Sequence, residues 1–163
     1  QDRGSTWLGY VTLFGDIDQN GIDDVLWIAT ERPEMAIHRG FGQPTAVFQF
    51  PGYQGVARYA DTGPLDTYVG DFNDDGSTDI LWNDLSANRN HMWVGLGNEG
   101  GTFDFTPVDQ EHPATDASSV DWTAFDGGVR ILDVDGDGIE DVAWIARAGT
   151  YRVYVALGKD ADT

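Results

Sequence analysis

The sequence predicts an all-β fold in which one unit of short antiparallel strands occurs three times. Three acidic loops of the same pattern begin at Asp16, Asp71 and Asp133, so they lie 55 and then 62 residues apart in a chain of 163 residues. Segments rich in Val, Ile, Leu and aromatic residues flank each loop, and such residues favour strands. No stretch has the apolar spacing of a long amphipathic helix. A repeat of this length is typical of propellers, solenoids and arrays.

Each acidic loop has the ligand pattern that wraps a hard divalent cation. Residues 16–24, 71–79 and 133–141 have an oxygen-bearing side chain at loop positions 1, 3, 5 and 9, and glycine at position 6. Alternate side chains then turn their oxygens inward, position 7 offers a backbone carbonyl, and glycine permits the sharp bend. A metal-free turn would explain one such loop, but three in register indicate an ion. All-oxygen cages with backbone carbonyls suit calcium better than magnesium.

Position 12 of each loop excludes an EF-hand. This position holds Trp27, Trp82 and Trp144, where an EF-hand has its bidentate glutamate. The residues around each tryptophan favour a strand, whereas an EF-hand loop lies between helices. These strands are apolar on both faces, so we expect the tryptophans to pack between neighbouring sheets. Stacking on a sugar is the alternative role for them.

Three or four predicted strands follow one another in the same order in each repeat. A short apolar strand precedes the loop, at 10–14, 67–69 and 129–132. The tryptophan strand follows the loop, at 24–28, 79–83 and 141–145. A third strand comes after a polar turn, at 35–39, 91–94 and 151–155. A fourth strand is readable only in the first two repeats, at 46–50 and 102–106. Each third strand reaches a glycine at a nearly constant distance from the loop: Gly42, Gly97 and Gly158.

Four short antiparallel strands per repeat is the layout of a propeller blade. We expect one propeller segment over 1–163, with repeats at approximately 5–62, 63–123 and 124–163. The connections at 51–66 and 107–128 are rich in Gly, Pro, Asp and Thr, which predicts loops between blades. Three blades, the last incomplete, cannot close a ring of the usual four to eight. We therefore expect part of a larger propeller, or one completed by oligomerisation.

The second repeat resembles the FG-GAP/VCBS repeat family. It reads Gly-Asp-Phe-Asn-x-Asp-Gly-x-x-Asp-Ile-Leu-Trp at 70–82 and Trp-Val-Gly-Leu-Gly-Asn-x-Gly-Gly-Thr-Phe at 93–103. The other repeats match the loop and the tryptophan strand, and match the tail less well. The resemblance implies blades of an integrin-α-like β-propeller with calcium in the loop between the first two strands. It implies up to three Ca²⁺ ions held by three ligand sets: Asp16, Asp18, Asn20, Ile22 (carbonyl) and Asp24; Asp71, Asn73, Asp75, Ser77 (carbonyl) and Asp79; Asp133, Asp135, Asp137, Ile139 (carbonyl) and Asp141.

The charge of the three ligand sets ranks their expected affinities. The loops at 16–24 and 71–79 each have one asparagine where the loop at 133–141 has only aspartates. Ligand charge is one of the factors that tune calcium affinity. We therefore expect the loop at 133–141 to bind calcium most tightly.

Composition excludes several classes of partner. The formal net charge is −19, from 28 acidic and 9 basic residues, which disfavours nucleic acid and anionic membrane surfaces. No apolar run approaches the ~20 residues of a membrane span, and no cysteine is present. The chain opens at Gln1 without a visible signal peptide, so we expect a processed mature chain or an excised segment. Weak calcium modules operate in the millimolar calcium outside cells, so we expect a secreted, extracellular protein.

Aromatic residues that do not follow the repeat are candidates for ligand contact: Tyr53, Trp93 and Trp122. Exposed rings can stack on the apolar face of a sugar, with core packing as the alternative. No serine nucleophile elbow, zinc-type histidine pair or phosphate-binding glycine loop is present, so binding is favoured over catalysis. Related propellers include lectins and adhesion receptors, so we expect carbohydrate or a cell-surface glycoconjugate as ligand. Alternatives are a non-catalytic propeller part of a secreted polysaccharide-degrading enzyme and a protein–protein interaction module. Further blades, from the same parent chain or from other chains, are expected partners.

Overall fold

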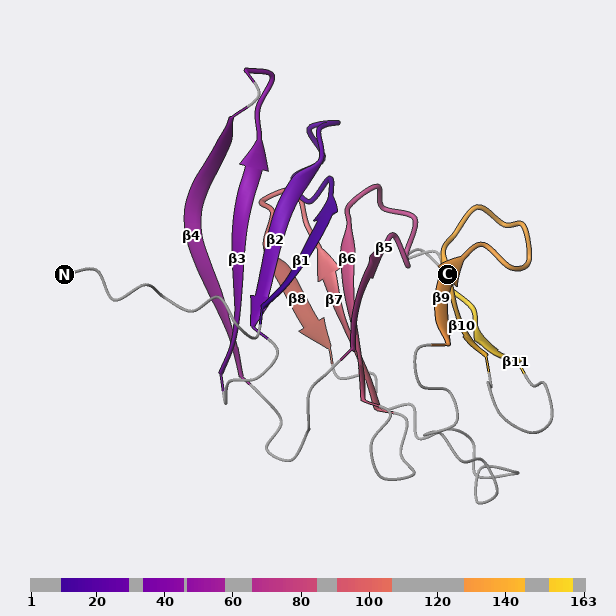
Figure 1. The fold of residues 1–163 in the computed structure, drawn as a ribbon. Helices are drawn as coiled ribbons and strands as arrows, with labels where there is room; N and C mark the ends of the chain where they lie inside the picture. The colour runs from indigo at the N-terminus through magenta and orange to yellow at the C-terminus, as the bar shows by residue number, and fades with distance from the viewer. Residues whose placement is uncertain are drawn as a thin grey trace.

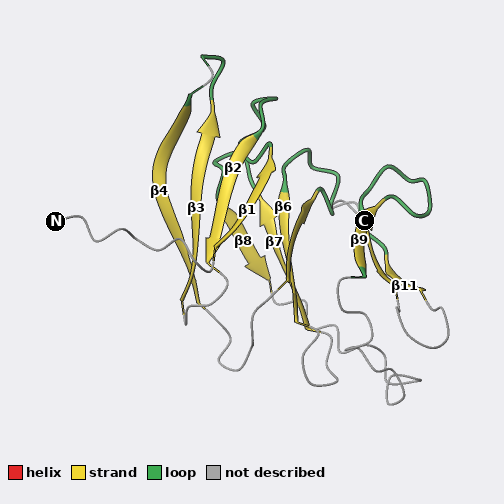
Figure 2. Ribbon diagram, viewed as in Figure 1, coloured by secondary structure: helices red, strands yellow, loops and turns green. Residues whose placement is uncertain are grey.

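Short antiparallel strands dominate the molecule (Figures 1 and 2). The computed structural model describes residues 10–29, 34–45, 47–57, 66–84, 91–106, 128–145 and 153–159. Within these ranges the strands run from β1 to β11 in three sheets and there is no helix. The described chain accordingly offers no helix with the length and apolarity to span a membrane.

Each sheet corresponds to one sequence repeat. Sheet 1 contains β1 (Tyr10–Gly15), β2 (Asp24–Ala29), β3 (Glu34–Gly42) and β4 (Phe48–Ala57). Sheet 2 contains β5 (Asp66–Gly70), β6 (Asp79–Asp84), β7 (His91–Gly97) and β8 (Phe103–Thr106). Sheet 3 contains β9 (Val129–Leu132), β10 (Asp141–Ile145) and β11 (Val153–Ala156). Strands that are consecutive in sequence are hydrogen-bonded neighbours in every sheet, and all pairs are antiparallel. The prediction of an all-β fold with three repeats is confirmed, and among the described residues the first two sheets have four strands and the third has three.

The three sheets pack face to face in chain order, and the first strand of each lies against the first strand of the next, β1 with β5 and β5 with β9 (Figure 1). We call the side that a sheet turns toward the next sheet its downstream face, and the opposite side its upstream face. One apolar cluster joins the downstream face of sheet 1 to the upstream face of sheet 2, with Leu26, Ile28 and Ile37 against Ile80 and Trp82. A second cluster joins sheets 2 and 3 in the same way. The core therefore lies between the sheets, as alternating side chains on strands buried on both faces require.

The repeated tryptophans lie on the upstream faces. Trp82 is 2% exposed and Trp144 is 1% exposed, because sheets 1 and 2 cover them. Trp27 is only half-buried, since no described element precedes sheet 1. Phe50 stacks on Trp27 with ring centroids 5.7 Å apart, as Phe105 stacks on Trp82 at 4.6 Å. Trp82 and Trp144 thus pack in the core, and Trp27 occupies the equivalent position on a face that no described sheet covers.

Strand β4 corrects the prediction that 51–66 is a loop. β4 continues to Ala57, although Pro51 and Gly52 interrupt its sequence. The pairing with β3 shifts register between Arg39 and Phe41, and Gly52 has a φ of 121°. Proline and a glycine bulge are tolerated here because β4 is the edge strand of its sheet.

Asn83 is a polar residue in a position that is apolar in the other repeats. Ile28 and Ile145 are its counterparts, four residues after Asp24 and Asp141. Asn83 is 1% exposed, and neither atom of its amide group has a hydrogen-bond partner among the described residues. A buried amide without partners costs about 1–3 kcal/mol. We expect Asn83→Ile to raise the free energy of unfolding in urea by about 1–2 kcal/mol, whereas Asn83→Ser, which keeps a polar group, gains nothing. A less stable Asn83→Ile protein would contradict this assignment.

Candidate metal loops and an aromatic hollow

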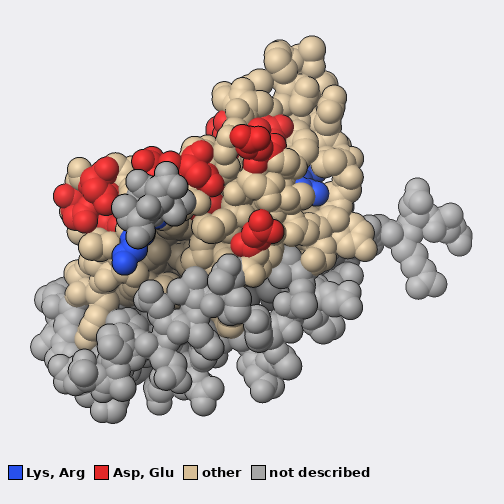
Figure 3. Space-filling view, turned by 180° about the vertical axis from the view of Figure 1, so that it is seen from behind, with Lys and Arg blue, Asp and Glu red and all other residues tan. Residues whose placement is uncertain are grey.

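The acidic loops lie at one edge of the three sheets. Loop 1 (residues 16–24) connects β1 to β2, loop 2 (71–79) connects β5 to β6, and loop 3 (133–141) connects β9 to β10. Because each connects the first two strands of its sheet, face-to-face packing brings the loops into one row. Figure 3 shows acidic side chains gathered along this edge.

Hydrogen bonds from the backbone fold each loop around its first aspartate. In loop 1, Asp16 accepts from the N–H groups of Asn20 at 3.0 Å and Gly21 at 2.7 Å. Asn20 in turn accepts from the Ile22 N–H at 2.8 Å, and Asp18 accepts from the Asn20 N–H at 3.3 Å. Bonds to positions 1, 3 and 5 also form in the other loops, at Asp71, Asn73 and Asp75 and at Asp133, Asp135 and Asp137. In loop 3 the donor to one Asp133 oxygen is the Gly136 N–H at position 4 rather than the N–H at position 5. Three different sequences thus adopt one turn.

The aspartate at position 9 ties each loop to the end of the third strand. Asp24 accepts from the Ile17 N–H at 2.9 Å with one oxygen and from the Gly42 N–H at 2.6 Å with the other. Equivalent pairs of bonds join Asp79 to Phe72 and Gly97, and Asp141 to Val134 and Gly158. All three aspartates are at most 1% exposed. The nearly constant glycine spacing in the sequence marks this bond, a role that sequence reasoning did not assign.

Burial raises the pKa of two of these position-9 carboxyls. For Asp24, desolvation raises the pKa most, the bonds from Gly42 and Ile17 lower it, and the charges of Asp18 and Asp16 raise it. For Asp79, desolvation outweighs its two backbone hydrogen bonds and, with the charges of Asp75 and Asp71, brings the pKa to about 7. A cation in the loop would favour the ionised forms again, because an opposite charge stabilises a carboxylate.

Oxygens from alternate loop positions converge as an ion site requires. Oxygens of Asp16, Asp18 and Asp24 lie within 4.8 Å of one another, and so do those of Asp133, Asp135 and Asp141. In loop 2 the residue at position 3 is Asn73, so an amide oxygen replaces one carboxylate of such a triad. The donor set is entirely oxygen, which fits a hard cation such as calcium. The carbonyls of Ile22, Ser77 and Ile139 stay predicted ligands.

Neighbouring loops also contact each other directly, which the sequence did not reveal. The Thr78 N–H donates to the Asp16 carbonyl at 3.0 Å, and the Glu140 N–H donates to the Asp71 carbonyl at 3.2 Å. Glu140 Oε2 also accepts from the Asp71 N–H at 2.7 Å. The Gln19 side chain donates to the Asp75 carbonyl at 3.2 Å. The row of loops is therefore continuous from one sheet to the next.

The charge difference between loops 1 and 3 leads to a mutational prediction. Asp133→Ala removes a ligand from the all-aspartate loop, so we expect it to weaken the tightest calcium site by at least about tenfold in calorimetric titrations. Asp16→Ala is expected to affect a weaker site and to leave the tightest one intact. Asp104→Ala is the control, since Asp104 is an exposed residue on β8, outside the acidic loops. Equal losses from the first two variants would refute the ranking.

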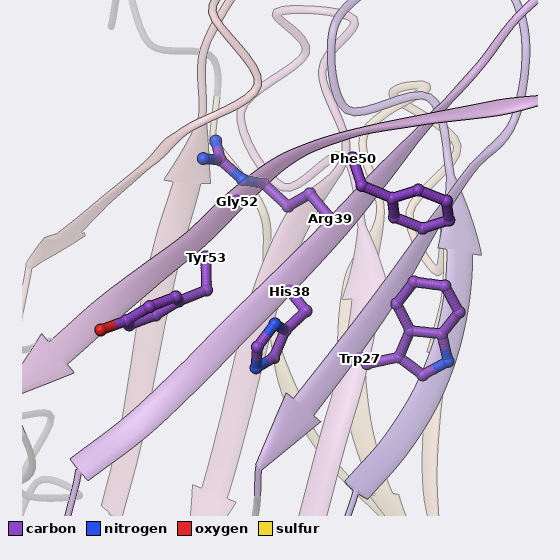
Figure 4. A pocket seen from close by; sticks show the side chains of 6 residues that line it. All are labelled: Trp27, His38, Arg39, Phe50, Gly52 and Tyr53. Atoms are coloured by element: carbon purple, nitrogen blue, oxygen red, sulfur yellow. The ribbon is translucent and has the colours of Figure 1, made fainter. Parts of the chain in front are cut away.

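The three predicted ligand-contacting aromatics lie in different surroundings. Trp93 is half-buried and packs against the core cluster between sheets 1 and 2. Trp122 lies outside the described residues. Tyr53 is 67% exposed on β4, and it lines a hollow of about 560 Å³ on the upstream face of sheet 1 (Figure 4). Trp27, His38 and Phe50 line the hollow with it, together with Arg39 and Gly52.

Part of the chain matches a known family. Residues 16–82 match the FG-GAP-like repeat. Repeats of this family are propeller blades, so the prediction of blades and the resemblance seen in the sequence are confirmed. A search of curated proteins found no match to the chain.

Proposed function

We propose that this chain, which carries an FG-GAP-like repeat over residues 16–82, is a calcium-stabilised set of β-propeller blades that serves as a binding module. The observation that carries the proposal is the shared hydrogen-bond skeleton of loops 1, 2 and 3. In each, oxygens at positions 1, 3 and 5 accept bonds from backbone N–H groups. In loops 1 and 3, oxygens of the aspartates at positions 1, 3 and 9 lie within 4.8 Å of one another. Such preorganisation suits one ion per loop.

The proposed role of calcium is structural. When bound, the ion supplies the positive charge that offsets the clustered carboxylates. The chain's own residues do the rest: Asp24, Asp79 and Asp141 join each loop to its third strand, and the backbone bonds of Thr78 and Glu140 join neighbouring loops. These loops operate with calcium at the millimolar level found outside cells, so an extracellular location belongs to the proposal.

A calcium titration tests this proposal. Calorimetry or dialysis with a calcium electrode should find up to three ions per chain, and the triple variant Asp16→Asn, Asp71→Asn, Asp133→Asn should find none at comparable affinity. Asparagine keeps the side-chain volume and removes the charge, so the comparison isolates the carboxylates. Failure of the wild-type chain to bind calcium at millimolar concentration would overturn the proposal.

Carbohydrate is the ligand class that we propose for the module where no other sheet covers the upstream face of sheet 1. Among the described residues, Tyr53 and the aromatic hollow support this ligand class. Trp93 does not, because it packs against the core. Aromatic rings stack on the apolar faces of sugars, and a hollow of about 560 Å³ has the volume of a small-ligand site. A glycan array with calcium present, probed with the chain at a concentration where it is monomeric, should identify a sugar whose binding is lost in Tyr53→Ala. An array without any bound sugar would remove carbohydrate from the proposal.

A further inference from the structure

The two end faces of the stack of sheets expose apolar side chains. On the upstream face of sheet 1, Phe48 is 43%, Phe50 62% and Tyr53 67% exposed. On the downstream face of sheet 3 the exposed apolar residues are Leu132, Val134, Ile145, Val153, Val155 and Leu157. One end is aromatic and the other is aliphatic. Exposed apolar patches of this kind mark interaction surfaces.

Equivalent positions in the other sheets show what normally covers these faces. Phe48 pairs with Gly42 as Phe103 pairs with Gly97, yet Phe103 is only 2% exposed because sheet 1 covers it. Val134 is 47% exposed, whereas Ile17, at the same position in loop 1, is 0% exposed under sheet 2. The side chains on the two end faces are thus exposed because no described sheet covers them, whereas a neighbouring sheet buries their counterparts.

We propose that a second copy of this chain docks head to tail, with its downstream face of sheet 3 on the upstream face of sheet 1. Within the chain, a downstream face already packs on an upstream face twice, between sheets 1 and 2 and between sheets 2 and 3. The uncovered faces of sheets 3 and 1 are the two surfaces that a third contact of this type needs. The described sheets of two copies number six, which lies within the four to eight blades of closed propellers. Each contact joins two different faces and is therefore heterologous. Two copies form a closed ring when the rotation between them brings both pairs of faces into contact.

The row of loops would continue through the same junction. Within the chain, the N–H at loop position 8 donates to the carbonyl at position 1 of the preceding loop, from Thr78 to Asp16 and from Glu140 to Asp71. In the assembly, Asp23 is the position-8 residue and Asp133 of the other copy is the position-1 residue. The junction therefore brings together acidic loops, and calcium should favour it by reducing their repulsion.

One residue departs from the repeat and makes the docking register testable. A Cβ on Gly15 would lie 2.5 Å from Thr78 Oγ1, and a Cβ on Gly70 would lie 2.5 Å from Glu140 Oε2. Sheet 3 has Leu132 at this position, 43% exposed. In the proposed register Leu132 meets the second copy's Asp23, so its side chain hinders close approach. Leu132→Gly should tighten the assembly, whereas removal of an exposed leucine would weaken a non-specific apolar contact.

The aromatic hollow belongs to this docking face. Trp27 and Phe50 line the hollow, and their counterparts Trp82 and Phe105 lie under sheet 1 in the core between the sheets. Within the chain, a sheet therefore covers the equivalent surface of sheet 2. This contact supports a sheet, rather than a sugar, as the occupant of the hollow. A sugar in the hollow and a further sheet of a longer parent chain are the competing occupants.

Sedimentation velocity in calcium tests the assembly. The wild-type chain should sediment as a dimer of twice 17.8 kDa. Phe48→Asp on one face and Val153→Asp on the other should each produce monomers, and both residues are exposed enough that the folded monomer tolerates the change. Gln49→Asp adds the same charge beside Phe48 at an exposed site and should leave the dimer intact.

Mixing the two monomeric variants distinguishes head-to-tail docking from like-face pairing. Phe48→Asp retains the sheet 3 face and Val153→Asp retains the sheet 1 face, so the mixture should form a heterodimer through one intact junction. Leu132→Gly should lower the dissociation constant several-fold. A monomeric wild-type chain, an open series of ever larger species, or a mixture that stays monomeric would overturn the proposal. Sugar binding that Tyr53→Ala abolishes in a monomeric wild-type chain would assign the hollow to carbohydrate instead.

Discussion

Excess chelator is expected to lower the melting temperature of the chain by at least ~5 °C for each calcium ion removed. An ion at 100 times its dissociation constant stabilises the folded state by about 2.7 kcal/mol. For a domain of this size, 1 kcal/mol corresponds to about 2–4 °C in melting temperature. The measurement is a thermal scan by circular dichroism with calcium and with excess chelator.

The control for this scan restores calcium above the chelator, which should recover the original melting temperature. Potassium chloride at matched ionic strength should not, because screening alone does not replace coordination. The same melting temperature with and without the chelator would contradict the assignment of calcium to the loops.

The loss on chelation should be cooperative across the sheets. Each loop fixes its own third strand through the position-9 aspartate, and loops 1 and 2 also accept a backbone bond from the next loop. An empty loop 2 therefore loosens contacts with both neighbours, through Thr78 on one side and Asp71 on the other. The buried Asp79 carboxyl, whose pKa burial raises to about 7, is part of this link. Among the described residues, and without an ion, its ionised form has two backbone N–H donors and the adverse charges of Asp71 and Asp75.

Periodic side chains made most of the strand order predictable from the sequence. Each strand next to an acidic loop alternates or is fully apolar, and the predicted 24–28, 79–83 and 141–145 correspond to β2, β6 and β10. The end of β4 was not predictable, because Pro51 and Gly52 are turn residues that an edge strand nevertheless tolerates. Local sequence does not state which strand will be at an edge.

Side-chain surroundings were harder to predict than strands. Trp93 breaks the repeat, which suggested a ligand contact, yet it packs against the core between sheets 1 and 2. Its register partner is Trp82, and the corresponding position in sheet 1 holds His38 opposite Trp27. A residue that varies between repeats can therefore still be a core residue, because the sheet that covers it varies too. Only the pairing of sheets decides this, and pairing is a long-range property.

Gly97→Ala is expected to be among the most destabilising single changes in the chain. A Cβ on Gly97 would lie 2.6 Å from the Thr78 carbonyl oxygen and 3.0 Å from the Ser77 Cβ. Backbone must move to make room, and overpacking of this kind costs about 1–3 kcal/mol. The movement also lengthens the Gly97 N–H bond to buried Asp79, for a further ~1–3 kcal/mol. Urea denaturation should therefore show a loss of about 2–5 kcal/mol.

Gly55→Ala provides the matched comparison, because a Cβ there would meet nothing within 4 Å and its backbone is in an ordinary strand conformation. This variant should be neutral or gain about 0.4–1 kcal/mol from a less flexible unfolded chain. Gly97→Ala should also weaken calcium binding in loop 2, since Asp79 is both the strand contact and a predicted ligand. If Gly97→Ala were as stable as Gly55→Ala, the constant glycine after each third strand would have no role in holding the loop. The nearly constant distance from each loop to this glycine would then reflect only the length of the third strand.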